Sequence, residues 1–182
     1  MGWLIAAAVI GALGVFVAFG YNSLIALRNL VQESWAQIEV QLKRRHDLIP
    51  NLVETVKGYA AHERATFENV TQARAAAMAA GGTPDQARAE SQLTQALFNL
   101  RAIAENYPEL RASENFQALQ AELAATEDGI ASSRRTYNDT VRRYDTRRQS
   151  IPWNMLTGLG DFPPFQYFEA DPDSRSPVKV EF

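Results

Sequence analysis

Apolar residues recur every three or four positions through most of the chain, the spacing that places side chains on one face of an α-helix. Four such stretches are separated by short segments rich in proline, glycine or polar residues, and they cover residues 24–49, 51–80, 83–106 and 113–151. Each apolar stripe is narrow, closer to two positions in seven than to a broad face. The pattern predicts an all-α protein built as an antiparallel four-helix bundle.

The residues expected to face the bundle core share an apolar character. They are Leu24, Leu27, Val31, Trp35, Ile38, Leu42, Ile49, Leu52, Val56, Tyr59, Phe67, Val70, Leu93, Ala96, Leu97, Leu100, Ile103, Phe116, Leu119, Leu123, Ile130, Tyr137, Val141 and Tyr144. An enzyme would need convergent polar side chains inside such a bundle, and these stripes contain only tyrosine hydroxyls and the indole of Trp35. Catalysis is therefore the function least favoured by the pattern.

Proline and glycine place the helix ends. Pro50 disfavours helical geometry at the preceding residue and removes a backbone donor, so we expect a turn or a sharp kink at residues 47–50. In the segment GGTPDQ, Gly81 is suited to end the second helix, while Thr83 is suited to cap the third with Pro84 at its first position. Pro108 ends the third helix, and Ser113 is the expected cap of the fourth.

An uncharged apolar run precedes these stripes, because the first charged side chain is Arg28. As a helix, Met1–Phe19 spans roughly 28 Å, which is sufficient to cross the bilayer core. A cleaved signal peptide is the alternative, but no Lys or Arg precedes the run, so a retained anchor is favoured. The expected anchor residues are Trp3, Leu4, Ile5, Val9, Ile10, Leu13, Val15, Phe16, Phe19 and Tyr21.

The charges that follow the anchor favour an N-terminus outside and a body in the cytoplasm, since no Lys or Arg precedes it. Small residues four positions apart, such as Gly2 with Ala6 and Gly14 with Ala18, allow transmembrane helices to approach closely. Their alternative reading is that alanine and glycine are common in any such segment.

Charge and composition exclude several classes of function. The net charge of −3 provides no general attraction for nucleic acid, and the absence of cysteine excludes disulfides and thiolate chemistry. His62-Glu63 resembles the start of a zinc-protease motif, but position 66 holds threonine where the second histidine belongs. No cofactor and no metal site is predicted.

Two basic segments are candidate contact sites. Lys43, Arg44 and Arg45 precede the expected turn at residues 47–50, which would place them at a bundle tip, available to a partner or simply favourable at a helix end. Near the end of the fourth helix, Arg142, Arg143, Arg147 and Arg148 are followed by Trp153 and further aromatic residues. These five residues suit anionic headgroups at the membrane surface. The alternative is that the aromatic residues pack on the bundle or on a neighbouring subunit.

The chain resembles the LemA family in YNSLIALRN (21–29), SWAQIEVQLKRRHDLIPNLVETVKGYAAHE (34–63), AENYPELRASENFQALQAELAATEDGIASSRRTYND (104–139) and PVKVEF (177–182). The resemblance implies a single-pass bacterial membrane protein with a four-helix bundle and no assigned reaction. Some members are linked to HtpX-like membrane proteases, and a relative takes part in magnetosome membrane formation. The match weakens after Tyr144, where Asp145 replaces the family's asparagine.

These observations predict an anchor at residues 1–22, a bundle at residues 23–151, and an aromatic and proline-rich segment with a polar tail at residues 152–182. The predicted function is a non-enzymatic scaffold or adaptor of the bacterial inner membrane that contacts lipids and forms homo-oligomers. Its main rival is an adaptor that presents substrates to a membrane protease.

Overall fold

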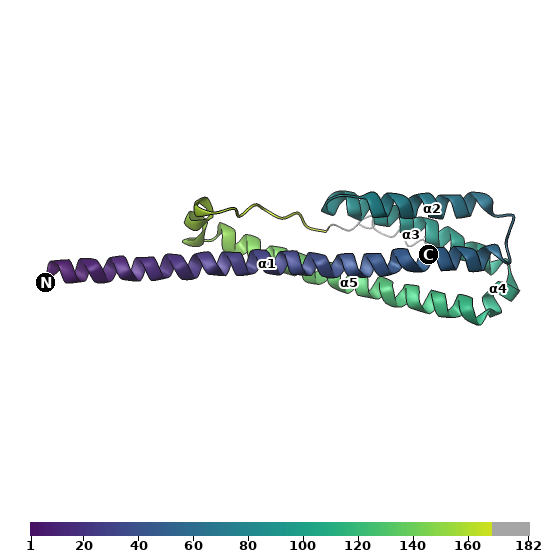
Figure 1. Cartoon of the computed structure of the whole chain (residues 1–182), viewed down its shortest axis with the longest axis horizontal. Coiled ribbons are helices and arrows are strands. Elements are labelled where there is room, and N and C mark those ends of the chain that lie inside the picture. Colours follow the sequence, from purple (N-terminus) through teal and green to yellow (C-terminus); the bar gives the residue numbers. More distant parts are fainter. Residues whose placement is uncertain (169–182) are drawn as a thin grey trace, which may run out of the picture. The chain divides into compact units, whose positions relative to one another are not determined.

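The computed structural model describes residues 1–168, and within them it contains helices and no strand (Figure 1). The helices are α1 (Gly2–Lys57), α2 (Arg64–Ala79), α3 (Thr83–Glu105), α4 (Pro108–Ala112), α5 (Glu114–Gln149) and the 3-10 helix η1 (Trp153–Leu159). The prediction of an all-α protein with one long apolar N-terminal helix is confirmed. The polar tail predicted at the end of the segment 152–182 lies outside the described residues.

The chain divides into two compact units, and helices α1 and α5 contribute to both. The two-helix unit comprises Met1–Gln37 and Ser133–Tyr167. The four-helix unit comprises Ile38–Ser132 and, among the described residues, Phe168. The predicted domain boundaries at residues 22 and 151 remain predictions from hydropathy, and α1 continues through the first of them without interruption.

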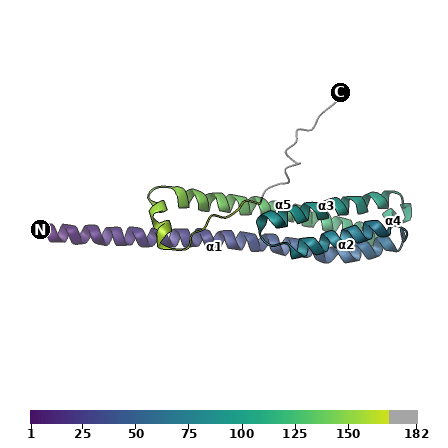
Figure 2. The same ribbon diagram turned by 90° about the horizontal axis from the view of Figure 1, so that it is seen from above.

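The four-helix unit is an antiparallel bundle made by the end of α1, helices α2 and α3, and the start of α5 (Figure 2). Its core contains side chains from all four helices, including Ile49, Phe67, Leu93 and Leu123, each at most 4% exposed. Leu110 of α4 closes one end of this core. The narrow stripes that the sequence predicted for these helices do face inward. Tyr59 does not, since it follows the end of α1 and is 43% exposed.

The predicted break at residues 47–50 is wrong. Pro50 lies inside α1, and the chain turns at residues 58–63 instead. A proline leaves the carbonyl four residues earlier without its helical donor, and here that carbonyl belongs to His46. Arg74 of α2 donates to it from Nε at 2.7 Å. A tertiary contact therefore supplies the hydrogen bond that proline removes, and the helix continues.

The connections after α2 differ from the prediction in two details. Gly82, not Thr83, is the N-cap of α3, and its φ of 81° lies in the region that favours glycine. Thr83 is the first helical residue and Pro84 the second. The segment expected only to break the chain before Ser113 forms the short helix α4, and α5 begins directly after Ser113.

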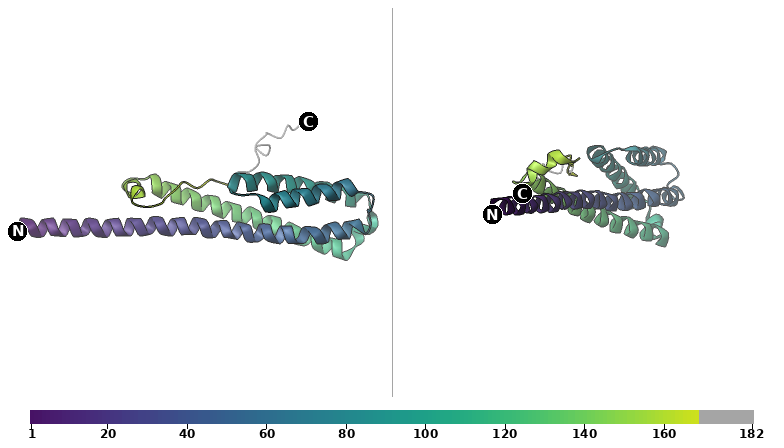
Figure 3. Two further views of the ribbon diagram at one scale, coloured as in Figure 1. Left: turned by 45° about the horizontal axis from the view of Figure 1, so that its top comes forward. Right: turned by 60° about the vertical axis from the view of Figure 1, so that its left-hand side comes forward.

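The two-helix unit pairs α1 with the end of α5 in antiparallel fashion, and η1 folds back beside α1 (Figure 3). Its interface contains both aromatic and aliphatic side chains. Trp35 of α1 contacts Tyr137 of α5 at a centroid distance of 5.4 Å. Leu24, Val31 and Val141 fill the rest of the interface, and none of them is exposed.

Candidate functional site

A cluster of charged side chains lies at the centre of the four-helix unit, around Glu90 of α3. This carboxylate is fully buried and accepts three hydrogen bonds. Arg45 Nη1 donates to its Oε2 at 3.1 Å. Gln86 Nε2 and His46 Nε2 lie 2.9 Å and 2.8 Å from its Oε1. Arg45 and His46, the two partners that α1 contributes, are also buried, at 1% and 6% exposure.

Arg45 connects three helices. In addition to Glu90, its Nη2 donates to the hydroxyl of Thr94 at 2.7 Å and pairs with the carboxylate of Glu127 on α5 at 2.9 Å. Thr94 in turn donates to the backbone carbonyl of Glu90. The guanidinium thereby links α1 to α3 and α5 through charge-assisted hydrogen bonds, which are stronger than neutral ones.

The geometry of this cluster suits a structural role better than a catalytic one. The oxygens of Glu90 are occupied by the protein's own donors, Arg45, His46 and Gln86. A general base needs access to the proton that it abstracts. A buried pair whose members satisfy each other is also strongly destabilised when one member is removed, by about 3–5 kcal/mol.

The expectation of a wholly apolar bundle interior is therefore wrong. Arg45 and His46 occupy the stripe between Leu42 and Ile49, and Glu90 precedes Leu93 by three positions in the stripe of α3. These spacings assign all three residues to inward faces. Opposite charges in the inward register of two helices were the signal that could have identified the cluster from sequence.

The prediction of a basic tip is also wrong in position, because the turn lies at residues 58–63 and Arg45 is inside the bundle. Its neighbours are exposed: Lys43 pairs with Asp47, and Arg44 pairs with Glu122 at 2.8 Å. The hydrogen bond from Lys43 lowers the pKa of the Asp47 carboxyl. A partner contact at Lys43 and Arg44 remains a prediction.

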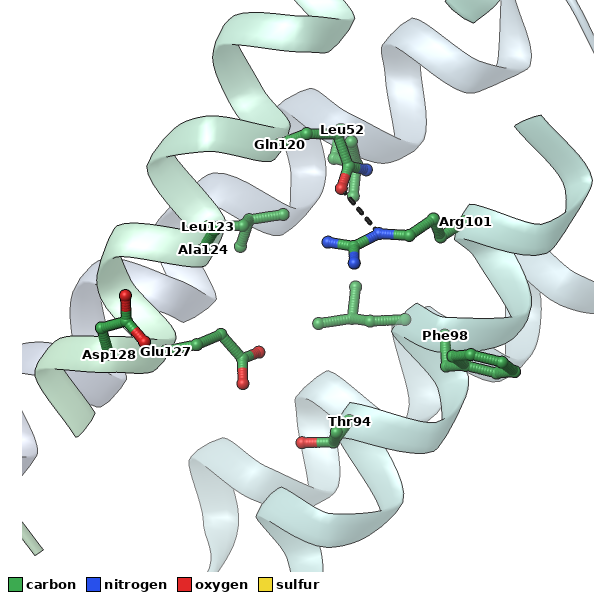
Figure 4. A pocket seen from close by; sticks show the side chains of 10 residues that line it. Leu52, Thr94, Phe98, Arg101, Gln120, Leu123, Ala124, Glu127 and Asp128 are labelled. Carbon is green, nitrogen blue, oxygen red and sulfur yellow. Dashed lines mark hydrogen bonds between the residues drawn. The ribbon is translucent and has the colours of Figure 1, made fainter. Parts of the chain in front are cut away.

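An open pocket of about 330 Å³ lies beside the cluster (Figure 4). Thr94 and Glu127, two of the partners of Arg45, form part of its wall. Arg101 of α3 donates to Gln120 of α5 at 2.9 Å across it. Phe98 lies at its edge and is 64% exposed. The pocket thus combines an exposed ring with charges of both signs.

The predicted membrane-surface tryptophan lies in the two-helix unit, against the protein's own helices. Trp153 stacks on Phe16 of α1 at a centroid distance of 5.1 Å. The guanidinium of Arg147 lies 3.8 Å from the centroid of the same indole. Trp153 therefore packs on the chain's own helix α1, while its contact with lipid headgroups stays a prediction. We call Trp153 and Leu156, with the helix surface that they cover, the η1 contact.

Gly20 makes the η1 contact possible. A Cβ at this position would lie 2.3 Å from the indole of Trp153 and 2.6 Å from Leu156. Only a residue without a side chain permits this approach, which is one of the established uses of glycine. Gly20 therefore has a packing role at the contact between α1 and η1.

The segment after η1 continues along the two-helix unit by tyrosine contacts. Tyr144 donates its hydroxyl to the carbonyl of Pro163 at 2.9 Å and meets the ring of Phe165 edge to face. Tyr137 donates to the carbonyl of Gln166 at 2.9 Å. Burial raises the pKa of the Tyr144 phenol. Arg28 of α1 donates to the carbonyl of Asp161.

The predicted anchor residues form the exposed start of α1. Trp3, Ile10 and Phe19 are each at least 70% exposed, and the remaining large residues of the run are at least 37% exposed. Tyr21 differs, because it is partly buried against Phe162. α1 contains a window long and apolar enough to cross a membrane. No group of three or more acidic or histidine side chains suited to a metal ion occurs in residues 1–168.

Comparison with known proteins gives a consistent result. The sequence model of the LemA family matches residues 34–182. The chain is 26% identical to magnetosome protein MamQ of Magnetospirillum gryphiswaldense, over 87% of this chain and 68% of that protein. Magnetosome protein MamQ 2 of Paramagnetospirillum magneticum has the same identity and coverage. Protein LemA of Metamycoplasma hominis is 23% identical over 86% of this chain and 72% of its own length.

Proposed function

Since this chain belongs to the LemA family, we propose that it is a non-enzymatic scaffold or adaptor, anchored in the bacterial inner membrane by the start of α1 and assembled laterally into homo-oligomers. The exposed apolar start of α1 carries the proposal. Large apolar side chains in water are costly, at about 1.5–3 kcal/mol each, and a bilayer removes that cost. The relatives named as magnetosome proteins and the apolar helix both fit a membrane protein.

The small residues of the anchor support lateral assembly. A Cβ added at Gly11 or Gly14 would meet nothing within 4 Å, so this surface is open in the single chain. Small residues four apart permit close approach of a second transmembrane helix. The body carries the charges and, by the bias of Lys and Arg toward the cytoplasm, the proposed orientation has the N-terminus outside.

The cluster around Glu90 supports the absence of catalysis. The two oxygens of Glu90 accept from Arg45, His46 and Gln86, so the cluster stabilises one arrangement of helices and this carboxylate is not free to act as a base. A rigid body of this kind suits a scaffold.

The test is the mass of the full-length protein in mild detergent, measured by light scattering. The scaffold proposal expects a large and homogeneous particle. Gly11→Leu/Gly14→Leu, which fills the open surface, should reduce its mass, while the control Val9→Leu/Val15→Leu should not. A monomeric wild-type particle, or a particle unaffected by both changes, contradicts lateral assembly through the anchor.

A second candidate is an adaptor for a membrane protease, favoured by the pocket beside Phe98. An exposed ring above charges of both signs is suited to hold a segment of another protein. The adaptor predicts that a protease co-purifies in detergent and is lost in Phe98→Ser. The scaffold predicts a homo-oligomer that forms without such a partner.

A further inference from the structure

We propose that a groove between α1 and the end of α5 binds the phosphate of an anionic phospholipid, an inference that rests on the proposed membrane anchorage. The groove has a volume of about 850 Å³ and lies within the two-helix unit. Leu27 and Leu30 form an apolar part of its wall, Arg143 and Arg147 a basic part, and Ser23 and Ser150 contribute hydroxyls. This combination suits a molecule with a charged head and apolar chains.

Two of the four predicted headgroup arginines have no acidic partner within residues 1–168. Arg142 pairs with Asp139, and Arg148 pairs with Asp145 at 3.4 Å. Arg143 and Arg147, in contrast, contact no carboxylate among residues 1–168. The Nε of Arg147 is buried without a hydrogen-bond partner. The groove therefore carries two positive charges that the described protein does not neutralise.

The η1 contact sets the depth of the groove relative to the anchor. The guanidinium of Arg147 lies on Trp153, and Trp153 lies on Phe16, which belongs to the apolar run. A bilayer has a hydrocarbon core of about 30 Å and headgroup layers of about 5–7 Å on each side. Ser23 follows Phe19 by four residues, or about 6 Å along the helix. The end of the groove at Ser23 thus coincides with the headgroup layer.

Exposed side chains of the neighbouring turn give an independent indication of the same depth. Ile151, Met155 and Leu159 are 79%, 74% and 65% exposed. Residues 149–160 carry no charge, although arginines directly precede them. An uncharged loop with three exposed apolar residues beside a transmembrane helix is suited to the membrane surface. A lipid held between this loop and the arginines meets an apolar surface with its chains and a cationic surface with its phosphate.

The two arginines favour a headgroup that has a phosphate and a net negative charge. Arginine binds phosphate oxygens by paired hydrogen bonds, and its planar group is already oriented here by the indole beneath it. A zwitterionic lipid carries a cation next to its phosphate, whereas an anionic lipid retains net charge for the two unpaired arginines. We therefore expect a preference for phosphatidylglycerol over phosphatidylcholine with the same chains.

The experiment uses the full-length chain, freed of lipid in mild detergent and titrated with either lipid while bound lipid is counted by native mass spectrometry. The wild type should favour phosphatidylglycerol, and Arg143→Gln/Arg147→Gln should lower that affinity about tenfold or more. The control Arg64→Gln/Arg111→Gln changes the net charge equally on exposed residues of the four-helix unit and should bind as the wild type does. Arg143→Gln alone, at an exposed position, should show a smaller loss.

Three outcomes would overturn the lipid site: equal binding of the two lipids by the wild type, unchanged binding by the double variant, or complete displacement of phosphatidylglycerol by millimolar inorganic phosphate. Flotation of the full-length chain with neutral vesicles separates this proposal from the anchorage. A chain that floats but lacks headgroup preference retains its anchor and loses the lipid site. A chain that does not float contradicts the anchorage itself.

Discussion

The two units of this molecule hold the same two helices together by different chemistry. In the four-helix unit, Arg45 on α1 is tied to Glu90 and Glu127 by charge-assisted hydrogen bonds inside an apolar core. In the two-helix unit, rings and small residues meet, as at Gly20 and Trp153. Charges in a core are sensitive to the loss of one partner, while ring contacts at a surface are sensitive to added volume. The two regions should therefore respond to different kinds of mutation.

The largest effect is expected at Glu90. Glu90→Ala leaves Arg45 and His46 without their buried acceptor, and should lower the free energy of unfolding by about 3–5 kcal/mol. Urea unfolding of the full-length protein in detergent, followed by circular dichroism, measures this. Glu122→Ala is the matched control, because it removes the exposed partner of Arg44 and should cost less than about 1 kcal/mol. Equal losses in the two variants would contradict the distinction between buried and exposed pairs.

A double-mutant cycle examines how α1 passes through Pro50. Arg74→Ala removes a charged donor from the His46 carbonyl and should cost about 1.5–3 kcal/mol. In a Pro50→Ala background the backbone supplies that hydrogen bond again, so the same Arg74→Ala change should cost less. Additive losses, measured by the same unfolding experiment, would show that Arg74 does not compensate for the proline.

In the two-helix unit, added side-chain volume at Gly20 should lower stability. Gly20→Ala places a methyl group against Trp153, which should cost about 1–3 kcal/mol and displace η1. Hydrogen exchange should then become faster in residues 151–160. Gly14→Ala is the control, since its Cβ would meet nothing within 4 Å. Unchanged exchange in both variants would contradict a close contact at Gly20.

The smallest expected effect is a loss of stability at alkaline pH, caused by deprotonation of Tyr144. Burial raises the pKa of this phenol above its ordinary value of 10.0. A raised pKa in the folded state means that the contribution of Tyr144 to stability is complete below the unfolded pKa and decreases as the pH rises through the folded pKa. The hydrogen bond to Pro163 is lost with the proton.

Melting temperatures of the wild type and Tyr144→Phe measure this contribution. At neutral pH the variant should be less stable by about 0.5–1.5 kcal/mol, and the difference should shrink as the pH passes about 10. If the stability difference between the two proteins stays constant across that range, the contribution of the hydroxyl does not depend on its protonation.

Much of the helical content could be predicted, because local patterns specify it. The stripe of α3 and its start beside Pro84 were recognisable, as was the length of α5. The apolar start of α1 could be predicted from the absence of charge before Arg28. The prediction of a break at Pro50 was wrong because it considered only hydrogen bonds within one helix. The donor that compensates for the proline, Arg74, belongs to α2.

The candidate sites were less accessible to sequence reasoning. Arg45 is adjacent in sequence to Lys43 and Arg44, but successive side chains of a helix point in different directions, so the three do not form one basic group. Trp153 could be singled out from the sequence, but its packing against Phe16 and Gly20 depends on the tertiary structure. The unequal pairing of the four arginines near the end of α5 also depends on which carboxylates lie within reach.

The sequence by itself determined that this protein is helical, that its first residues are apolar enough to enter a bilayer, and which stripes form its core. These properties depend on periodicity and composition, which act over a few turns of helix. The tertiary structure decided that α1 continues through Pro50, that Arg45 is a core residue rather than a surface one, and that Gly20 receives the indole of Trp153. Each of these outcomes depends on atoms contributed by a distant part of the chain, and only the packed helices bring those atoms together.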